Sequence, residues 1–315
     1  MRVTAARLLR HGQDLRIEDV ALPAPGDGDV VMDVAYAGVN PVDMYAAEGK
    51  VAPDAPVPRT LGTEAAGTVD GRRVMVRGHG IGTARDGVWA TGAVVPLAAV
   101  IEVPEGVALE TAAAMGVAGV TAWRTVTEVA RITSDDTVLV LGASGGVGSI
   151  IVSVAHDIGA TVIGQTGDEG NSGWIRDRGA DQVIVADAGR LADALAGLKP
   201  TAVFDGLGDG FTEAAVEALQ PHGRLVLFGT SAGPQGHISL QSLYRKGLRI
   251  LGYAGLLASD EELATATRQA LEALAAGRFS VPIDSALPLS DVNEAFDRIR
   301  QRNVRGKLVL DTSST

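Results

Sequence analysis

The residues Val138-Leu139-Val140-Leu141 form an uninterrupted apolar run, and Gly142-Ala143-Ser144-Gly145-Gly146-Val147-Gly148 follow them directly. An apolar run of this kind is typical of a strand that is buried on both faces of a parallel sheet. After the glycines, apolar residues recur at helical spacing and predict a helix over 147–158: Ile150, Ile151, Val154 and Ile158. The stretch therefore predicts a buried strand, a tight glycine turn and a helix in immediate succession.

The same alternation continues to about residue 255. Short apolar runs predict further strands at 161–163, 182–185, 202–204, 224–228 and 248–251. Amphipathic stretches between these runs predict helices at 172–178, 190–198 and 211–219. Strands that alternate with helices at this spacing predict a parallel, doubly wound sheet.

The residues on either side of this region are organised differently. In the first hundred residues, short apolar segments such as 30–34 and 73–76 are broken by Gly, Pro and Asp, which predicts a β-rich region. Two amphipathic helices are predicted at 261–276 and 291–300, and we expect both to pack against the N-terminal part. The predicted fold is thus α/β, with a discontinuous β-rich domain (1–117 and 256–315) and an inserted domain (118–255).

The composition excludes several classes of function. The formal net charge of −11 repels phosphate backbones, so we expect no nucleic-acid partner. The chain contains no cysteine, which excludes disulfides, thiol nucleophiles and zinc sites that are built on thiolates. No run of about 18 apolar residues occurs, and the first residues lack a signal-peptide core, so we expect a cytoplasmic protein that does not bind membranes.

The glycine cluster after the first buried strand is the main candidate for ligand binding. Glycines at such a turn let the backbone approach a pyrophosphate, and the helix that follows offers free N–H groups and the positive end of its dipole. The spacing from Gly142 is G-x-x-G-x-x-G rather than G-x-G-x-x-G. A purely structural turn is the alternative, and the strand before and the helix after the glycines favour a dinucleotide site.

The residues at the end of the second strand indicate whether the dinucleotide is NAD(H) or NADP(H). NAD-specific sites usually carry an acidic side chain there, which accepts a hydrogen bond from the ribose 2′-hydroxyl. In this chain the position holds Thr166, followed by Gly167, and neither residue repels a 2′-phosphate. We therefore predict NADPH, although Asp168 and Glu169 lie close by and no Lys or Arg occurs between Thr166 and Arg176.

Several further motifs occur in one order along nearly the whole chain. They are Gly38-Val39-Asn40-Pro41-Val42-Asp43-Met44-Tyr45, Leu61-Gly62-Thr63-Glu64-Ala65-Ala66-Gly67-Thr68-Val69, Thr121-Ala122-Trp123, Gly145-Gly146-Val147-Gly148, Gly223-Arg224-Leu225-Val226 and Gly306-Lys307-Leu308-Val309. Together they resemble the zinc-independent, zeta-crystallin-like quinone oxidoreductases of the medium-chain dehydrogenase/reductase superfamily. The resemblance implies a GroES-like β-rich catalytic domain (1–117 and 256–315), a Rossmann NADP(H)-binding domain (118–255) and a cofactor in the cleft between them.

The resemblance also bears on zinc. Zinc-dependent relatives carry Cys near the position of Asn40, a His-Glu pair near Thr63-Glu64, and a four-cysteine structural lobe. This chain has Asn40, Thr63 and no such lobe, so we expect no zinc, and Glu64 alone does not make a metal site. Without a Lewis acid to polarise an alcohol, the resemblance implies hydride addition to a carbon that is already electrophilic.

The site residues that we predict are partly derived from the residues and partly implied by the resemblance. The predicted catalytic residues are Asn40, whose amide can donate and accept, and Tyr45, whose hydroxyl can donate. A turn residue before Pro41 is the alternative for Asn40, and a core tyrosine is the alternative for Tyr45. The predicted cofactor-binding residues are Asn40, Thr121, Ser144, Gly145, Gly146, Val147, Thr166, Gly167, Gly206, Phe228 and Gly229.

Three functions are consistent with these features. The first is an NADPH-dependent reductase that transfers hydride to a quinone or to the activated C=C bond of an enone or enal. The second is an enoyl-thioester reductase of fatty-acid or polyketide metabolism, and the third is a non-catalytic nucleotide-binding protein. We expect a small-molecule substrate and a homodimer, and the resemblance implies an interface near Tyr244 and Tyr253.

Overall fold

The computed structural model describes residues 1–313, which divide into two compact units. Unit 1 comprises Met1–Val120, Ala258–Ala276 and the residues from Val281 onward. Unit 2 comprises Thr121–Leu257 and Gly277–Ser280. Unit 1 contains two sheets and unit 2 contains one, and each unit has its own hydrophobic core.

Unit 2 is built on a six-stranded parallel sheet with the strand order β11-β10-β9-β12-β13-β14. Its strands are β9 (Thr137–Val140), β10 (Thr161–Thr166), β11 (Gln182–Val185), β12 (Ala202–Asp205), β13 (Arg224–Leu227) and β14 (Arg249–Gly252). The chain reverses its direction of travel across the sheet between β11 and β12, which places β9 and β12 side by side. The predicted doubly wound α/β sheet is confirmed, and β9 lies at the point where the strand order reverses.

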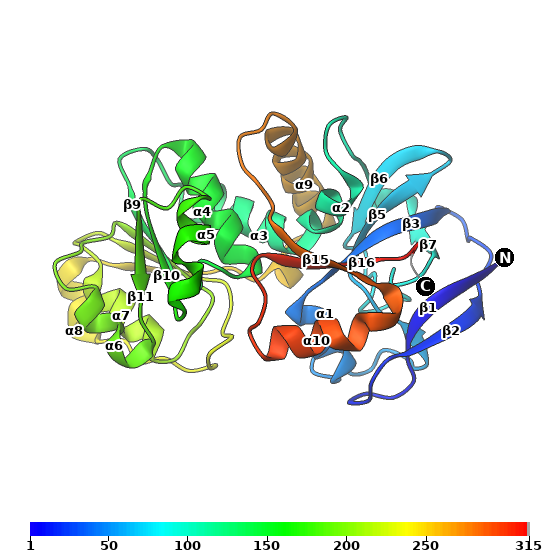
Figure 1. Ribbon diagram of the computed structural model, residues 1–315, viewed down its shortest axis with the longest axis horizontal. Coiled ribbons are helices and arrows are strands. Elements are labelled where there is room, and N and C mark those ends of the chain that lie inside the picture. The colour runs from blue at the N-terminus through cyan, green and yellow to red at the C-terminus, as the bar shows by residue number, and fades with distance from the viewer. Residues whose placement is uncertain (314–315) are drawn as a thin grey trace. The chain divides into compact units, whose positions relative to one another are not determined.

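Helices cover both faces of this sheet, with α4 and α5 on one side and α6 and α7 on the other (Figure 1). The helical segments of unit 2 are α3 (Val120–Arg124), the π-helical η3 (Thr125–Val129), α4 (Gly146–Ile158), η4 (Glu169–Asn171), α5 (Ser172–Arg176), α6 (Ala188–Ala194), α7 (Gly210–Ala218), α8 (Leu240–Lys246) and η5 (Gly255–Leu257). The core under α6 and α7 contains buried apolar side chains of the sheet such as Leu139, Val203 and Leu225. Apolar strands with both faces covered are typical of parallel sheets.

The predicted helix at 190–198 lies earlier in the chain than expected. Asp187 caps α6, because its carboxylate accepts a hydrogen bond from the backbone N–H of Arg190 at 3.0 Å. The helix ends at Ala194, and Gly197 follows with a left-handed φ of +84°. The capping aspartate thus sets the start of the helix, which the apolar spacing alone did not reveal.

Unit 1 contains two sheets that are mainly antiparallel. The smaller has the order β2-β1-β4, and the larger has the order β15-β16-β3-β5-β6-β8, with β7 paired to β3. The strands are β1 (Arg2–Leu8), β2 (Arg16–Ala21), β3 (Asp29–Val39), β4 (Arg59–Thr60), β5 (Glu64–Val69), β6 (Arg72–Arg77), β7 (Gly92–Pro96), β8 (Val100–Glu102), β15 (Ile283–Pro288) and β16 (Lys307–Asp311). The C-terminal strands therefore complete a sheet that begins near the N-terminus.

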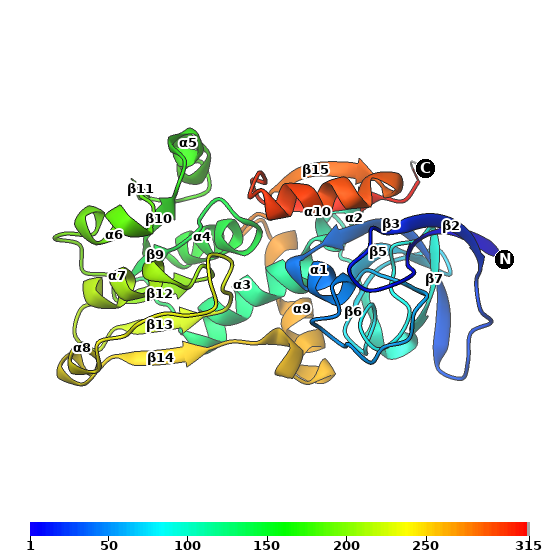
Figure 2. The same ribbon diagram turned by 90° about the horizontal axis from the view of Figure 1, so that it is seen from below.

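The helices of unit 1 pack against these sheets (Figures 1 and 2). They are α1 (Pro41–Ala47), η1 (Leu97–Ala99), α2 (Leu109–Ala113), the π-helical η2 (Met115–Gly119), α9 (Asp260–Ala275), η6 (Leu289–Asp291) and α10 (Val292–Arg300). The fully buried Trp89 lies in this core, with its ring centroid 5.5 Å from that of Phe296 on α10. Its indole Nε1 donates a hydrogen bond to the carbonyl of Gly38 at 3.0 Å, so one side chain links β3 to α10.

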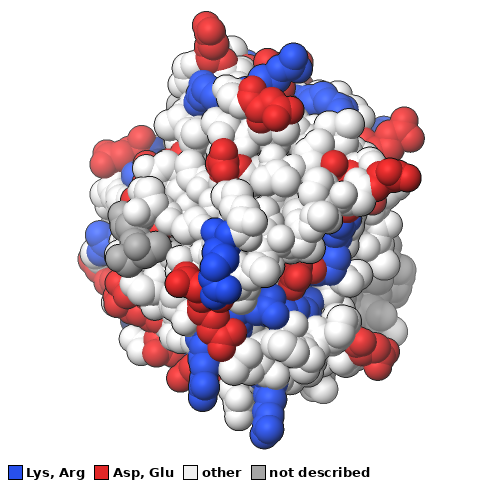
Figure 3. Space-filling model, turned by 90° about the vertical axis from the view of Figure 1, so that its right-hand side faces the viewer, with Lys and Arg blue, Asp and Glu red and all other residues white. Residues whose placement is uncertain are grey.

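The surface is mixed in charge on the face drawn in Figure 3. Acidic and basic side chains are interspersed there among uncharged ones. No helix of the described residues is both long enough and apolar enough to span a bilayer.

Candidate functional site

The glycine cluster forms the turn between β9 and the 13-residue helix α4. Gly142 has a φ of +65°, and a Cβ on Gly148 would lie only 2.3 Å from the carbonyl oxygen of Gly142. Gly145 is the N-cap of α4 and supplies no side-chain hydrogen bond to the helix. The first N–H groups of a helix have no partners within the helix, so this N-terminus presents uncapped donors at the positive end of the dipole. The predicted phosphate-binding residues Ser144, Gly145, Gly146 and Val147 thus make up a turn that suits an anion.

Gln165 holds this turn in place, and the sequence analysis did not identify it. The side chain of this buried residue accepts a hydrogen bond from Gly142 N at 2.9 Å and donates one to Ala186 O at 2.7 Å. It therefore ties the glycine turn to β10 and to the end of β11. A glutamine inside an apolar strand pattern was the only available signal.

The end of β10 is polar and uncharged where it meets the glycine turn. Thr166 is buried, and its hydroxyl accepts hydrogen bonds from Asp168 N at 3.3 Å and from Asn171 Nδ2 at 3.2 Å. Asn171 Nδ2 also lies 3.3 Å from the hydroxyl oxygen of Ser144. The carboxylate of Asp168 accepts a hydrogen bond from Gly170 N at 2.9 Å, so it forms part of the turn that follows the strand. A Cβ on Gly167 would meet no atom within 4 Å, so the space beside this residue is not filled by other protein atoms.

The remaining predicted cofactor residues of the sheet lie at the ends of β12 and β13. A Cβ on Gly206 would lie 2.7 Å from the ring of Phe228, and one on Gly229 would lie 3.1 Å from Gly206 O. The three residues are therefore in close contact. Asp205 accepts hydrogen bonds from Leu207 N, Gly208 N and Thr212 Oγ1 at 2.8, 2.9 and 2.6 Å, which makes it a structural cap.

Strands β10, β9, β12 and β13 are adjacent and parallel, so their carboxyl ends share one edge of the sheet. The structure thus brings together eight predicted residues along this edge: Ser144, Gly145, Gly146, Val147, Thr166, Gly167, Gly206 and Phe228, with Gly229 beside them. Ligands of open α/β sheets bind outside the carboxyl ends of the strands at the reversal of strand order. Thr121 lies on α3, where its carbonyl accepts a hydrogen bond from Thr125 Oγ1 at 2.7 Å.

In unit 1, Asn40 belongs to a buried cluster of polar groups. It is the N-cap of α1, and its Nδ2 donates a hydrogen bond to Glu64 Oε1 at 2.6 Å. Its Oδ1 accepts one from the ammonium of Lys307 at 2.5 Å. The second hydrogen on Nδ2 has no partner among the described residues, so one donor of the predicted catalytic amide remains uncommitted.

Glu64 and Lys307 are the charged members of this cluster. Lys307 Nζ lies 3.3 Å from Glu64 Oε1 and 2.8 Å from the carbonyl of Val39, and both side chains are almost completely buried. Glu64 Oε2 accepts a hydrogen bond from Val117 N, in the π-helical turn η2, at 2.7 Å. A Cβ on Gly38 would lie 2.2 Å from the Glu64 carboxylate, so glycine at this position makes room for the charge.

The oxygens of this cluster do not fit a zinc ion. Val39 O, Asn40 Oδ1 and Glu64 Oε1 are all engaged by the Lys307 ammonium, which is already the local positive charge. Zinc sites are built from thiolate, imidazole and carboxylate groups, and the cluster offers no thiolate or imidazole, while its Glu64 carboxylate is paired with the Lys307 ammonium. Among residues 1–313, no group of three or more His, Cys, Asp or Glu residues is arranged to hold a metal ion.

Asp43 is a second buried carboxyl group beside this cluster. It accepts hydrogen bonds from Asn40 N at 2.8 Å and from Thr63 N at 3.1 Å. Burial raises the pKa of Asp43 from 3.8 to about 7, and the nearby Glu64 carboxylate also raises it. The hydrogen bonds from Thr63 and Asn40 and the Lys307 charge act in the opposite direction.

The raised pKa of Asp43 predicts a pH-dependent stability. The folded protein binds this proton more tightly than the unfolded chain, so the stabilising contribution is complete below pH 3.8 and is lost as the pH rises through about 7. Between pH 5 and 7 the free energy of unfolding should fall by about 1.4 kcal/mol per pH unit from this group alone. Urea denaturation of the wild type and of Asp43→Asn over this range measures the difference, and parallel pH profiles would contradict the assignment.

Tyr45 lies on α1, one turn beyond Asn40, and is 39% exposed. Lys50 Nζ lies 6.0 Å from the centre of its ring. Tyr45 is therefore partly accessible to solvent, which a residue with a donor hydroxyl requires.

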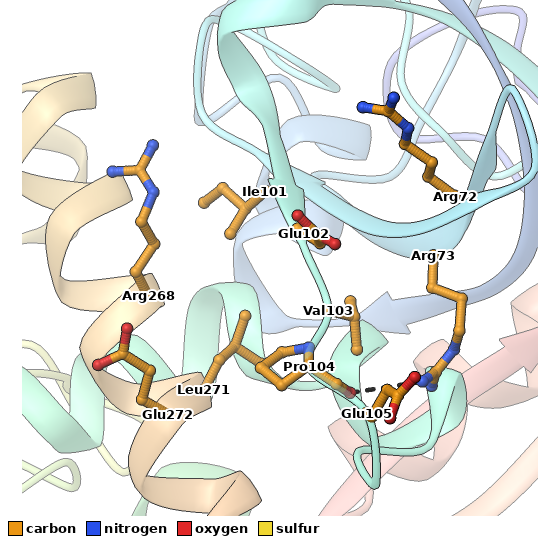
Figure 4. Close-up of a pocket in the computed structure, with 10 residues that line it drawn as sticks. All are labelled: Arg72, Arg73, Ile101, Glu102, Val103, Pro104, Glu105, Arg268, Leu271 and Glu272. Carbon is orange, nitrogen blue, oxygen red and sulfur yellow. Dashed lines mark hydrogen bonds between the residues drawn. The ribbon is translucent and has the colours of Figure 1, made fainter.

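One pocket of about 510 Å³ lies in unit 1. Its side chains come from β6, from β8 and the loop after it, and from α9, as Figure 4 shows. They are Arg72, Arg73, Ile101, Glu102, Val103, Pro104, Glu105, Arg268, Leu271 and Glu272. No predicted site residue lines this pocket, and its three arginines are matched by three glutamates.

Comparisons with known families and relatives agree with this architecture. Residues 26–105 match the alcohol dehydrogenase GroES-like domain, and residues 178–310 match the zinc-binding dehydrogenase family. A quinone oxidoreductase of Salmonella typhimurium is 28% identical, with 96% of this chain and 97% of the relative covered. A zinc-type alcohol dehydrogenase-like protein of Schizosaccharomyces pombe is 30% identical, with 91% and 88% covered.

Solved structures of related proteins have the same fold over nearly the whole chain. A mycobacterial protein in complex with NADPH is 27% identical with a TM-score of 0.85, and the match covers 98% of this chain and 99% of that one. An NAD-dependent alcohol dehydrogenase is 26% identical with a TM-score of 0.88, and 99% of each chain is covered. These relatives and the two-unit fold with its glycine turn identify the chain as a member of the medium-chain dehydrogenase/reductase superfamily of oxidoreductases.

Proposed function

We propose that this oxidoreductase uses NADPH to reduce a quinone or the activated C=C bond of an enone or enal. The observation that carries the proposal is the uncapped N-terminus of α4 beside the uncharged end of β10. The first feature suits a pyrophosphate, and the second has no carboxylate at Thr166 itself, while the nearby Asp168 carboxylate accepts a hydrogen bond from Gly170 N within the turn. The relatives include both an NADPH complex and an NAD-dependent enzyme, so the preference for NADPH rests on Thr166 and its neighbours.

The residues along the carboxyl edge of the unit 2 sheet would hold the dinucleotide. The backbone N–H groups of the glycine turn would hold the pyrophosphate, and Gly206, Phe228 and Gly229 would contact the remainder along the same sheet edge. A bound reduced nicotinamide supplies the hydride. The oxygens around Asn40 are engaged by the Lys307 ammonium and do not suit a zinc ion that would activate an alcohol, which supports an acceptor that is already electrophilic.

The residues of unit 1 would act on the acceptor. The uncommitted Nδ2 hydrogen of Asn40 is a donor for the nicotinamide ribose or for the carbonyl oxygen on which negative charge develops. Because Glu64 and Lys307 engage the rest of this amide, its orientation is fixed before a ligand binds. The exposed Tyr45 hydroxyl is a second donor.

A substrate panel tests this function against the two alternatives. Oxidation of NADPH and NADH is followed at the nicotinamide absorbance band with quinones, alkenals, enones and an enoyl-thioester. We expect turnover with quinones or enones, and faster turnover with NADPH than with NADH. Preference for the enoyl-thioester would favour the thioester reductase, and binding of NADPH without turnover on any acceptor would favour a non-catalytic protein.

We also propose that two copies of the chain associate through the edge of the unit 2 sheet. Strand β14 is the last strand of this sheet and has no buried residue, so its outer edge is free to pair. Large apolar side chains are exposed on the neighbouring α8 and η5, among them Tyr244 and Leu257 at 69% and 88%. A two-fold axis at this edge would cover the same patch on both copies.

The proposed dimer predicts that Leu257→Asp lowers the association constant by at least about tenfold, because a carboxylate in an apolar interface must be desolvated. Sedimentation equilibrium measures the constant. Leu97→Asp is the matched control, since Leu97 is 56% exposed on unit 1. Equal association of the wild type and both variants would contradict this interface.

A further inference from the structure

Asn171 lies between two of the predicted cofactor residues, although its sequence context gave no reason to select it. Its Nδ2 is 3.3 Å from Ser144 Oγ on the glycine turn and 3.2 Å from Thr166 Oγ1 at the end of β10. The amide therefore connects the glycine turn to the end of β10. In dinucleotide-binding sheets, the first of these elements contacts the pyrophosphate and the second contacts the adenosine ribose.

The turn from 166 to 171 fixes the position of Asn171. Its backbone N–H donates a hydrogen bond to Asp168 O at 3.1 Å, and the Asp168 carboxylate caps η4 through Gly170 N at 2.9 Å. Asp168 N in turn donates to Thr166 Oγ1 at 3.3 Å. One role of Asp168 is thus to build the turn that presents the Asn171 side chain.

The side chains of Asn171, Ser144 and Thr166 are uncharged, and each of them can both donate and accept hydrogen bonds. Asn171 Oδ1 is buried and has no hydrogen-bond partner within residues 1–313, which is an unfavourable state for an acceptor. A ribose hydroxyl would supply the missing donor. A half-turn of the amide would instead present its N–H groups to a phosphate, while the Ser144 and Thr166 hydroxyls donate to Oδ1.

We propose that Asn171 is the residue that reads the 2′ position of the cofactor's adenosine ribose, and that its neutral amide accepts either a hydroxyl or a phosphate there. This inference rests on the proposed function, because it requires a dinucleotide at the edge of the unit 2 sheet. It refines the cofactor preference: NADPH is favoured over NADH only modestly, because the Asn171 amide is neutral and offers a 2′-phosphate no counter-charge.

Isothermal titration calorimetry with two fragments that cannot react tests the inference. Adenosine 2′,5′-bisphosphate carries the 2′-phosphate, and 5′-AMP carries the 2′-hydroxyl. For the wild type, the two dissociation constants should agree within about tenfold. Asn171→Lys should tighten the bisphosphate by at least about tenfold with little effect on 5′-AMP, because it adds a charge-assisted contact.

Asn171→Asp should weaken binding of the bisphosphate relative to 5′-AMP by at least about tenfold. The reason is that a carboxylate repels the 2′-phosphate and accepts a hydrogen bond from the 2′-hydroxyl. Asn303→Ala, at an exposed asparagine of unit 1, is the matched control and should change neither constant. Equal changes for both fragments in the Lys and Asp variants would indicate a purely structural residue and overturn the assignment. A wild type that binds neither fragment nor NADPH would overturn the proposed function itself.

Discussion

Replacing Gly148 with alanine is expected to weaken NADPH binding by at least about 100-fold. The new Cβ would lie 2.3 Å from the carbonyl oxygen of Gly142, which is backbone and cannot turn aside. The glycine turn must therefore shift, and its N–H groups would no longer be oriented to donate hydrogen bonds to the proposed pyrophosphate. Loss of two hydrogen bonds to a charged group, at about 1.5 kcal/mol each, accounts for this factor.

Two further glycine variants make the Gly148 experiment specific. Gly145→Ala should have a smaller effect, because its Cβ would lie 3.3 Å from the same oxygen. Gly189→Ala on α6 is the matched control, since its Cβ would meet only an ordinary contact at 3.6 Å. Fluorescence titration with NADPH measures binding, and thermal unfolding shows whether each variant is folded. Wild-type affinity in a folded Gly148→Ala protein would exclude the glycine turn as the pyrophosphate site.

Replacing Lys307 with methionine should destabilise the protein by about 3–5 kcal/mol, the range for removing one partner of a buried ion pair. Methionine keeps most of the volume of the side chain but leaves the Glu64 carboxylate buried with no counter-charge. It also removes the donors to Asn40 Oδ1 and Val39 O, so the predicted catalytic amide loses part of its support. Urea denaturation followed by circular dichroism measures the change in the free energy of unfolding.

A double variant separates charge from packing in the Lys307 experiment. Lys307→Met combined with Glu64→Gln should recover a large part of the lost stability, because no buried charge then remains unpaired. Lys50→Met is the control, since the Lys50 side chain is 69% exposed and its ion pair with Glu48 lies at the surface. If Lys307→Met costs no more than Lys50→Met, the buried pair does not stabilise the fold as argued.

The sequence was sufficient for the features that depend on neighbouring residues. The apolar run at 138–141, the glycines after it and the helical spacing beyond them specify a strand, a turn and a helix, because backbone geometry is set locally. The glycine turn and the uncharged residue at Thr166 could be selected as candidate cofactor-binding features for the same reason. Ordered motifs along the chain were sufficient to indicate the superfamily.

Contacts between residues distant in the chain were decided only by the tertiary structure. Lys307 is separated from Asn40 by 267 positions, and no pattern in the sequence indicates that its ammonium contacts that amide. Asn171 and Ser144 are brought together only because β9 and β10 pair in register. Burial likewise follows from packing of the whole unit, and it is burial that raises the pKa of Asp43. Local chemistry thus determined the elements and their motifs, whereas the folded chain determined which side chains share charge, protons and hydrogen bonds.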